Sequence, residues 1–334
     1  MNLMLRMPAE WEAQSAVWLA WPANKTWWPG NYEKVSHRFA ALISKISNYT
    51  AVKLICTEEA RKDAESKIFQ SCPLLNNISF VDYETDDVWC RDFGPIFVSN
   101  FNNKAEIVDW EFNAWGDKFP NWQKDNAFPK FAGKELNLKV HSPKIVLEGG
   151  AIDVNGNGWL LTTEEVLLNP NRNEDMNRES YELFFRDYLG IENTIWLKRG
   201  LHNDDTDGHI DNLARFVNEN TILIASEADT KSPNYEPLKE NLAVLKKYDF
   251  SIEQLPLPDP VYFEGEMLPA SYLNFLISNE LILVPTYDQS LKDKQALSTI
   301  KKLFPEHKVE GFDCRDFLQE GGAIHCLTQQ QPAI

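Results

Sequence analysis

Hydrophobic residues near the start of the chain follow two different periods. Residues 16–21 form an apolar run that stops at Pro22, which predicts a buried strand. In residues 32–47 apolar side chains recur at helical spacing, which predicts an amphipathic helix. Residues 52–56 are strand-like again, and Thr57 followed by Glu58 and Glu59 is typical of a helix start. The chain therefore begins as strand, helix, strand, helix.

The same alternation continues to the end of the chain. Helical spacing occurs in residues 176–188 and 238–248, and Ser290 with Asp293 opens a helix that runs to Phe304, which makes five candidate helices. Residues 113–134, rich in Asn, Gly, Pro and Trp, have no period and predict a long surface loop of the kind that often serves as a lid. Further strands are predicted at residues 78–81, 96–99, 105–110, 144–147, 159–162, 194–197, 215–217, 221–225 and 281–284.

Strands that alternate with helices, without a linker-like segment, predict an α/β fold in a single domain over residues 1–334. Two short strings also repeat. Cys-Arg-Asp-Phe occurs at 90–93 and 314–317, and Glu-Gly-Gly-Ala-Ile occurs at 148–152 and 320–324. The spacing between the strings differs, so the chain is not a simple duplication. Unless they recur by chance, the strings indicate that similar corners of a pseudo-symmetric fold surround one centre.

Composition narrows the functional classes. The 334 residues carry a formal net charge of −17, which argues against nucleic acid or an anionic membrane as partner and is compatible with a small cationic substrate. No apolar stretch reaches membrane-spanning length, and the start has no signal-peptide pattern. The five cysteines are widely spaced, without a C-x-x-C pair, as expected for free thiols in a reducing compartment. We therefore expect a cytoplasmic protein.

The end of the chain is its most informative stretch. Cys326 directly follows His325 and comes soon after Gly321 and Gly322. Glycines allow backbone to come close to whatever lies opposite the sulfur, because they lack a Cβ. A reactive cysteine needs an electropositive and partly open setting, since the thiolate is the nucleophile. A small buried residue on a last strand is the alternative for a lone cysteine.

Three polar clusters accompany Cys326. The first spans residues 86–95, the second is Glu148 before two glycines, and the third spans residues 202–211. A cysteine, a histidine and several carboxylates on loops are the groups that nucleophilic catalysis with proton transfer requires. The third cluster also offers two histidines and four aspartates to a metal, but without the helical spacing of a metalloprotease. A papain-like protease would have its cysteine near the start of the mature chain. We expect no metal.

Six motifs follow one another along the chain. They are Glu10 with Val17-Trp18-Leu19-Ala20-Trp21-Pro22, Trp89-x-Arg91-Asp92-x-Gly94-Pro95, Phe112-Asn113-Ala114-Trp115-Gly116, Glu148-Gly149-Gly150, Gly208-His209-Ile210-Asp211 and Gly322-Ala323-Ile324-His325-Cys326-x-Thr328-Gln329-Gln330. Together they resemble the agmatine deiminases, which belong to the bacterial-type peptidylarginine deiminase-like group of the guanidino-group modifying superfamily. The resemblance covers about residues 7 to 332.

The resemblance implies a fold and a set of roles. The fold is a five-fold pseudo-symmetric α/β propeller of ββαβ units around a central active site, and no cofactor is implied. The implied roles are a nucleophile on the guanidinium carbon (Cys326), a clamp on the guanidinium nitrogens (Asp92 and Asp211), a proton carrier (His209, paired with Glu148) and channel walls (Trp89 and Trp115). The chain departs from the family at two places: Ala151-Ile152-Asp153 stands for the usual Ser-Ile-His, and Glu320-Gly321-Gly322-Ala323 for the usual Gly-Gly-Gly-Asn.

The chemistry of a guanidinium supports this interpretation. Its planar N–H pairs call for carboxylates, which accept them in bidentate fashion. We expect an agmatine deiminase that forms N-carbamoylputrescine and ammonia through a thiouronium on Cys326, a step toward putrescine. The acidic pair Asp204 and Asp205 suits the distal amine of agmatine. A deiminase of free or peptidyl arginine, an amidinotransferase and a non-catalytic cation-binding protein stay open as alternatives, as does a homodimer.

Overall fold

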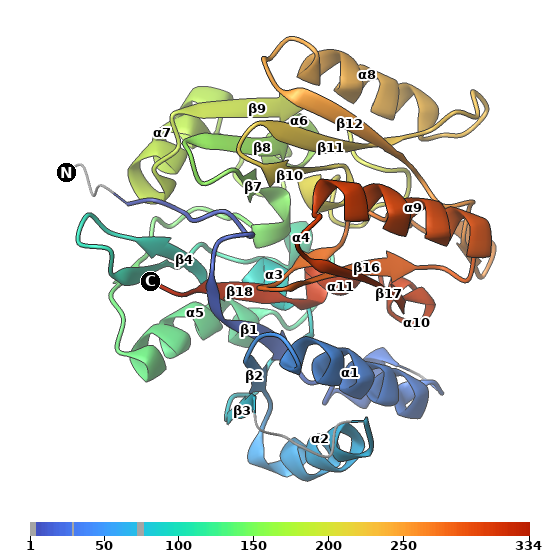
Figure 1. The fold of residues 1–334 in the computed structure, drawn as a ribbon. Helices are drawn as coiled ribbons and strands as arrows, with labels where there is room; N and C mark the ends of the chain where they lie inside the picture. Colours follow the sequence, from blue (N-terminus) through green and yellow to red (C-terminus); the bar gives the residue numbers. More distant parts are fainter. Residues whose placement is uncertain (1–4, 29, 72–76) are drawn as a thin grey trace.

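The chain folds into several small sheets with helices around them. The computed structural model describes residues 5–28, 30–71 and 77–334. Six sheets occur in these ranges, and the largest has four strands, so the α/β class is confirmed. In Figure 1 helices α1 (Tyr32–Ser47), α7 (Arg178–Leu189), α8 (Tyr235–Leu245) and α9 (Ser290–Leu303) lie at the outside. None of the helices in the described ranges is long and apolar enough to cross a membrane.

Five of the sheets share one strand order. Each begins with an antiparallel pair and adds a third strand parallel to the second. A helix joins the two parallel strands in every case, because a parallel pair needs a long crossover. The ordered triplets are β18 (Gln329–Pro332), β1 (Gln14–Ala20) and β2 (Val52–Ile55); β4 (Ile96–Ser99), β5 (Ala105–Val108) and β6 (Val140–His141); β7 (Asp153–Val154), β8 (Trp159–Thr163) and β9 (Asn193–Leu197); β10 (Ala214–Asn218), β11 (Thr221–Ser226) and β12 (Ser251–Pro256); and β15 (Leu276–Ile277), β16 (Leu281–Thr286) and β17 (Lys308–Asp313).

The remaining elements extend this pattern. The first sheet has a fourth strand, β3 (Ile78–Val81), which follows helix α2 (Glu58–Ser71), and the sixth sheet is the hairpin of β13 (Tyr262–Phe263) and β14 (Glu266–Met267). Both ends of the described chain meet in the first sheet, where Gln14 pairs with Pro332. The other short helices are η1 (Lys25–Trp27), α3 (Cys90–Phe93), α4 (Ala114–Asp117), η2 (Gly149–Ala151), α6 (Glu164–Leu167), η3 (Ile210–Asn212), α10 (Arg315–Leu318) and α11 (Ile324–Leu327).

The predicted loop at residues 113–134 is wrong in its second half. Helix α5 (Gln123–Leu136) occupies it and provides the crossover from β5 to β6. Phe128, Ala132 and Gly133 are buried at helical spacing, so tertiary packing outweighs the polar composition and Pro129 within the helix. The predicted strand at 144–147 is also wrong, because β6 lies earlier and Val146 makes only an isolated bridge. The five crossover helices thus include α5, whereas α2, counted among five from the sequence, is additional.

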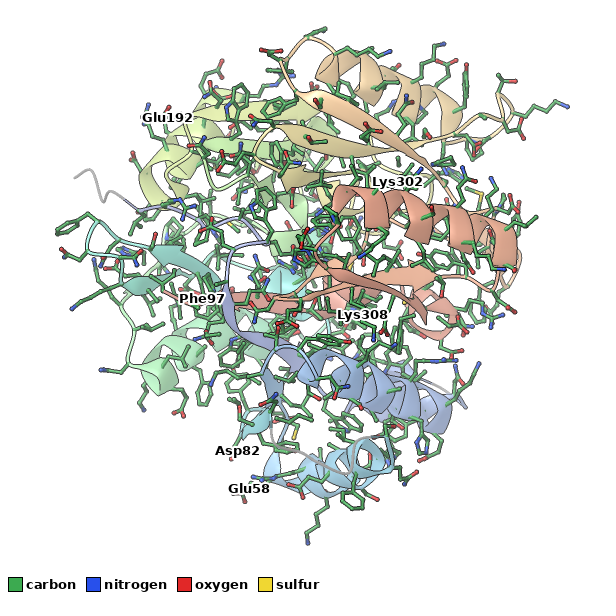
Figure 2. All side chains as sticks on the ribbon, in the orientation of Figure 1. Glu58, Asp82, Phe97, Glu192, Lys302 and Lys308 are labelled. Atoms are coloured by element: carbon green, nitrogen blue, oxygen red, sulfur yellow. The ribbon has the colours of Figure 1, made fainter. Side chains whose placement is uncertain are left out.

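Figure 2 shows that side chains fill the spaces between these elements. Glu58 and Glu192, both exposed, lie at the rim of the view. The interior contains Trp18, Trp21 and Phe39 without appreciable solvent exposure. The four cysteines in the described ranges are free and buried, and Cys72 lies outside those ranges. Burial of this much aromatic surface gives a rigid frame for the turns at its centre.

Candidate active site

Short helical turns from separate sheets meet in the middle of the molecule. Helix α3 packs against α11 and η2, and η2 packs against η3. Figure 1 shows α3 and α11 between the sheets, away from the outer helices. Each of these four turns directly precedes the first strand of a sheet: α3 precedes β4, η2 precedes β7, η3 precedes β10 and α11 precedes β18. They carry Asp92, Asp211 and Cys326, Glu148 stands directly before η2, and none of the four is more than 4 % exposed. The fold therefore brings together the three clusters and the cysteine that the sequence singled out.

Asp92 is held by neutral donors. Its Oδ2 accepts a hydrogen bond from Trp115 Nε1 at 2.9 Å, and its Oδ1 accepts one from the backbone N–H of Gly150 at 3.0 Å. A Cβ at Gly150 would lie 2.7 Å from Asp92 Oδ1 and 2.5 Å from His209 Nδ1, so only glycine fits there. Burial, together with the charges of Asp211 and Glu148, raises the pKa of Asp92 to about 6. This carboxylate lacks a formal cationic hydrogen-bond partner within the described chain.

Asp211 is held by a buried network that includes His325, Glu10 and Arg215. Its Oδ2 lies 2.7 Å from His325 Nδ1 and 3.7 Å from Cys326 Sγ. His325 Nε2 is 2.8 Å from Glu10 Oε2, and Glu10 also pairs with the buried Arg215. Burial acts to raise the pKa of Asp211, but the hydrogen bond and charge of His325 outweigh it and lower the pKa. Burial also acts to raise the pKa of Glu10, but Arg215 and His325 outweigh it and lower the pKa.

Cys326 lies in a short helical turn rather than on a strand. It belongs to α11, not to the last strand β18. Asn274 Nδ2 is 3.0 Å from its sulfur. Burial, with the negative charges of Asp211 and Asp92, raises the pKa of the Cys326 thiol well above its usual range. The resting group is therefore a thiol, and a cation at the neighbouring carboxylates would favour its thiolate.

The predicted pairing of His209 with Glu148 is wrong in this structure. Glu148 Oε1 accepts a hydrogen bond from Arg172 Nε, and His209 Nδ1 lies 3.6 Å from Asp92 Oδ1. Glu148 and His209 are both fully buried. Within the described ranges the two ring nitrogens of His209, Oε2 of Glu148 and Oδ1 of Asp211 have no hydrogen-bond partner. Because buried polar atoms are rarely left unpaired, these atoms indicate where a polar ligand would bind.

A narrow cavity of about 50 Å³ leads to Cys326. Indole and phenyl rings form much of its wall, and Trp89 packs so closely on Gly322 that a Cβ there would lie 2.4 Å from the ring. Burial and neighbouring charge raise the pKa of Asp87 to about 7, and burial alone raises that of Glu320 to about 7. None of the described residues that line the cavity is positively charged. They are Trp27, Trp28, Asp87, Trp89, Asp92, Trp115, Phe119, Asp205, Thr206, Glu320, Gly321, Gly322 and Cys326.

The acidic pair of the third cluster divides between two places. Asp205 lines the cavity, as expected from the sequence. Asp204 does not: its Oδ1 accepts hydrogen bonds from the backbone N–H and the hydroxyl of Thr206, and its Oδ2 accepts one from Asn212 at 3.4 Å. The expectation that Asp204 faces the cavity mouth is therefore wrong, because its oxygens are used inside the loop.

Two further residues join the site without a sequence signal. Arg172, from the segment after α6, binds Glu148 and Asp207 and donates to the backbone carbonyls of Trp115 and Thr206. Asn274, in the segment that leads into β15, contacts Cys326. Neither belongs to the three polar clusters named above or to a repeated string, although residues 169–175 around Arg172 are themselves polar. Only the strand order brings them to the centre.

Comparisons with known proteins match nearly the whole chain. A profile of the Porphyromonas-type peptidyl-arginine deiminase family matches residues 6–332. A protein named agmatine deiminase from Pseudomonas aeruginosa (strain LESB58) is 37% identical over 358 residues, which cover 98% of this chain and 95% of the relative. A solved structure of a C. jejuni agmatine deiminase, a cysteine-to-serine variant with substrate bound, has a TM-score of 0.90 at 34% identity and covers 98% of this chain and 96% of its own. Agmatine deiminase of Enterococcus faecalis has a TM-score of 0.91 at 30% identity, with 98% and 96% covered.

Proposed function

The chain belongs to the Porphyromonas-type peptidyl-arginine deiminase family, and we propose that it is an agmatine deiminase, which hydrolyses agmatine to N-carbamoylputrescine and ammonia. One observation carries the proposal: Cys326, with Asp211 3.7 Å from its sulfur, and Asp92 line a cavity that carries acidic side chains and, among its described lining residues, no basic one. That lining suits a substrate with a cation at both ends. A carboxylate near the α-carbon, as in free arginine, would instead need a basic partner.

Asp92 and Asp211 form the clamp for the guanidinium. Asp92 lines the cavity beside Cys326, and Asp211 Oδ2 lies 3.7 Å from the sulfur with Oδ1 unpaired within the described chain. Each charge pair with a guanidinium is worth roughly 4 kcal/mol at 4 Å and an effective dielectric near 20. Two such pairs hold the planar cation with its carbon at Cys326 Sγ and offset the negative charge that disfavours the thiolate.

The buried His209 supplies and accepts protons. Cys326 gives its proton to His209 as the sulfur attacks the guanidinium carbon, and His209 passes that proton to the leaving nitrogen so that ammonia departs. The thiouronium that results is attacked by water, and His209 takes a proton from that water. The carbon–sulfur bond then breaks, which releases the ureido product and restores Cys326. Glu148, anchored by Arg172, places its carboxylate near Asp92.

The cavity mouth selects the distal amine. Asp205, Asp87 and Glu320 line the cavity, where Asp205 and Glu320 are exposed, and the rings of Trp89 and Trp115 line it as well and would flank the aliphatic chain. A protonated amine is attracted by all three carboxylates and by the faces of the rings. Glu320 stands where the resembling family usually has glycine, so this chain adds a negative charge to the mouth.

Product analysis of the purified protein tests the function. The protein is incubated with agmatine, free arginine or an arginine peptide. It should form a ureido product from agmatine at least tenfold faster than from the others. A difference of roughly 1.4 kcal/mol in activation free energy is enough for that ratio. Turnover of arginine but not of agmatine would replace the agmatine assignment by an arginine deiminase. Ammonia should appear without any added amine; a strict requirement for an amine acceptor would instead identify an amidinotransferase.

The strand order supports a wider proposal for the fold. We propose a five-fold pseudo-symmetric α/β propeller in one catalytic domain, and the five units of the same ββαβ order support this proposal. The cytoplasmic location and a homodimer, both expected from the sequence, stay predictions that fractionation and light scattering test.

A further inference from the structure

Asn274 contacts the reacting atom of the site. Its Nδ2 lies 3.0 Å from Cys326 Sγ, and its side chain is buried. We propose that Asn274 is a catalytic residue whose amide N–H stabilises the Cys326 thiolate, both when the sulfur attacks and when the carbon–sulfur bond breaks. The proposal rests on the proposed function for the reaction it serves. Its physical content, a donor held against the sulfur, is independent of the substrate.

The neighbours of Asn274 fix which end of its amide faces the sulfur. The oxygen and nitrogen of an amide are distinguished by their partners. Asn274 Oδ1 accepts the backbone N–H of His325 at 3.0 Å and that of Cys326 at 3.3 Å. Because both of these groups can only donate, the oxygen must face them. The NH₂ group therefore faces Sγ, as a donor.

A second hydrogen bond fixes the other proton of the same NH₂ group. Nδ2 also donates to Asn212 Oδ1 at 3.0 Å, and Asn212 Nδ2 donates to Asp204 Oδ2 at 3.4 Å. An ionised carboxylate can only accept, so Asp204 sets the direction of the chain that runs through Asn212 to Asn274. This gives Asp204 a place in the site other than the cavity mouth.

The surroundings of Cys326 make such a donor necessary. Asp211 Oδ2 lies 3.7 Å from the sulfur, and burial together with the charges of Asp211 and Asp92 disfavours the thiolate. Asn274 is the side chain among the described residues that donates a hydrogen bond to Sγ. Hydrogen bonds to charged groups are stronger than those to neutral ones, so this bond strengthens as the thiol becomes a thiolate.

The position of Asn274 in the fold provides independent support. It lies in the segment that leads into β15, the first strand of its sheet, as Asp92, Glu148, Asp211 and Cys326 lie in the segments that lead into β4, β7, β10 and β18. All five sheets that share the strand order thus place a polar side chain at the centre from the segment before their first strand. Four of these side chains are in the proposed catalytic set, and Asn274 is the fifth.

Alkylation of Cys326 tests the proposal without any substrate. Iodoacetamide reacts with the thiolate, and mass analysis of the peptide that contains Cys326 reads this site alone. Asn274→Ala removes the donor, and Asn274→Asp places a carboxylate oxygen against the sulfur. At neutral pH each should slow alkylation of Cys326 by roughly ten- to a hundredfold, with Asn274→Asp the slower. Turnover of agmatine should fall by a similar factor through kcat, while KM changes little.

Asn241→Asp is the matched control. Asn241 is also fully buried and makes two backbone hydrogen bonds, at 2.7 Å from Lys198 N–H and 2.8 Å to the Arg199 carbonyl, away from Cys326. It should leave the alkylation rate at the parental value even if it lowers the melting temperature. Folded Asn274 variants with a parental alkylation rate at every pH would overturn the proposal, whatever the parent does with agmatine. If neither variant folds, the Asn274 side-chain amide resonance decides: it should shift between parent and Cys326→Ala, and an unchanged resonance would overturn the proposal.

Discussion

At the scale of single residues, the two carboxylates of the clamp have different partners. Asp211 is hydrogen-bonded to His325, and its pKa is lowered although it is fully buried. Asp92 has only Trp115 and the Gly150 N–H as donors, and its pKa is raised to about 6 by burial and neighbouring carboxylates. Asp211 is thus the fixed charge of the pair. Asp92 is the member that gains most from a bound cation.

Asp92→Asn and Asp211→Asn should each lower kcat/KM for agmatine by at least about a hundredfold. Each change removes one side of a buried ion pair with the guanidinium, which typically costs about 3–5 kcal/mol. Steady-state kinetics with agmatine measure the effect, with the exposed Asp249→Asn as control. Near-parental kinetics of both clamp variants would exclude the two-carboxylate clamp.

The limits of prediction at this scale have a physical cause. The cysteine, His209 and the acidic residues stand in local strings whose composition already signals chemistry. Arg172 stands in a polar stretch without a recognised motif and Asn274 in an apolar one, and their roles arise from partners distant in the chain, such as Cys326, which is 52 residues from Asn274. Contacts between distant segments depend on the strand order, which no local pattern contains.

At the scale of elements, the repeated strings have unequal structural meaning. Glu-Gly-Gly-Ala-Ile leads into η2 before β7 and into α11 before β18, which are equivalent positions in two sheets. Cys-Arg-Asp-Phe forms α3 before β4 but also α10 after β17, which are not equivalent. Only the first string therefore reports a reused corner. Helix α5 is an element that the sequence pattern did not predict, because its buried positions lie in a polar segment that contains Pro129.

His325 joins the start of the chain to its last helix. Its two ring nitrogens lie 2.8 Å from Glu10 and 2.7 Å from Asp211, both buried. His325→Gln should lower the free energy of unfolding by about 3–5 kcal/mol, because one or both carboxylates lose their buried partner. Denaturant titration measures the loss, and His37→Gln on the exposed face of α1 should stay at the parental value. Equal stability of the two variants would show that the bridge contributes nothing.

At the scale of the whole molecule, the net charge of −17 and the acidic mouth act in the same direction. A negative field attracts a dication and raises its local concentration at the cavity, while it repels anions. The charges at the mouth are not constant with pH, since the pKa values of Asp87 and Glu320 are raised to about 7. The molecule should therefore lose affinity for its substrate in weakly acidic solution, before most surface carboxylates are protonated.

The pH profile of kcat/KM tests this coupling, because it reports the groups of the free enzyme. Agmatine stays doubly charged throughout, so the change must come from the protein. As pH falls, Glu320 and Asp87 lose their charges near 7 and Asp92 loses its charge near 6, and each loss weakens binding of the cation. Below about pH 6, kcat/KM should therefore fall by about tenfold per unit. Glu320→Gln should remove part of the change near 7 and leave the limb near 6, whereas a flat parental profile from about pH 8 to about pH 5 would contradict the assignment of Asp92 to the clamp.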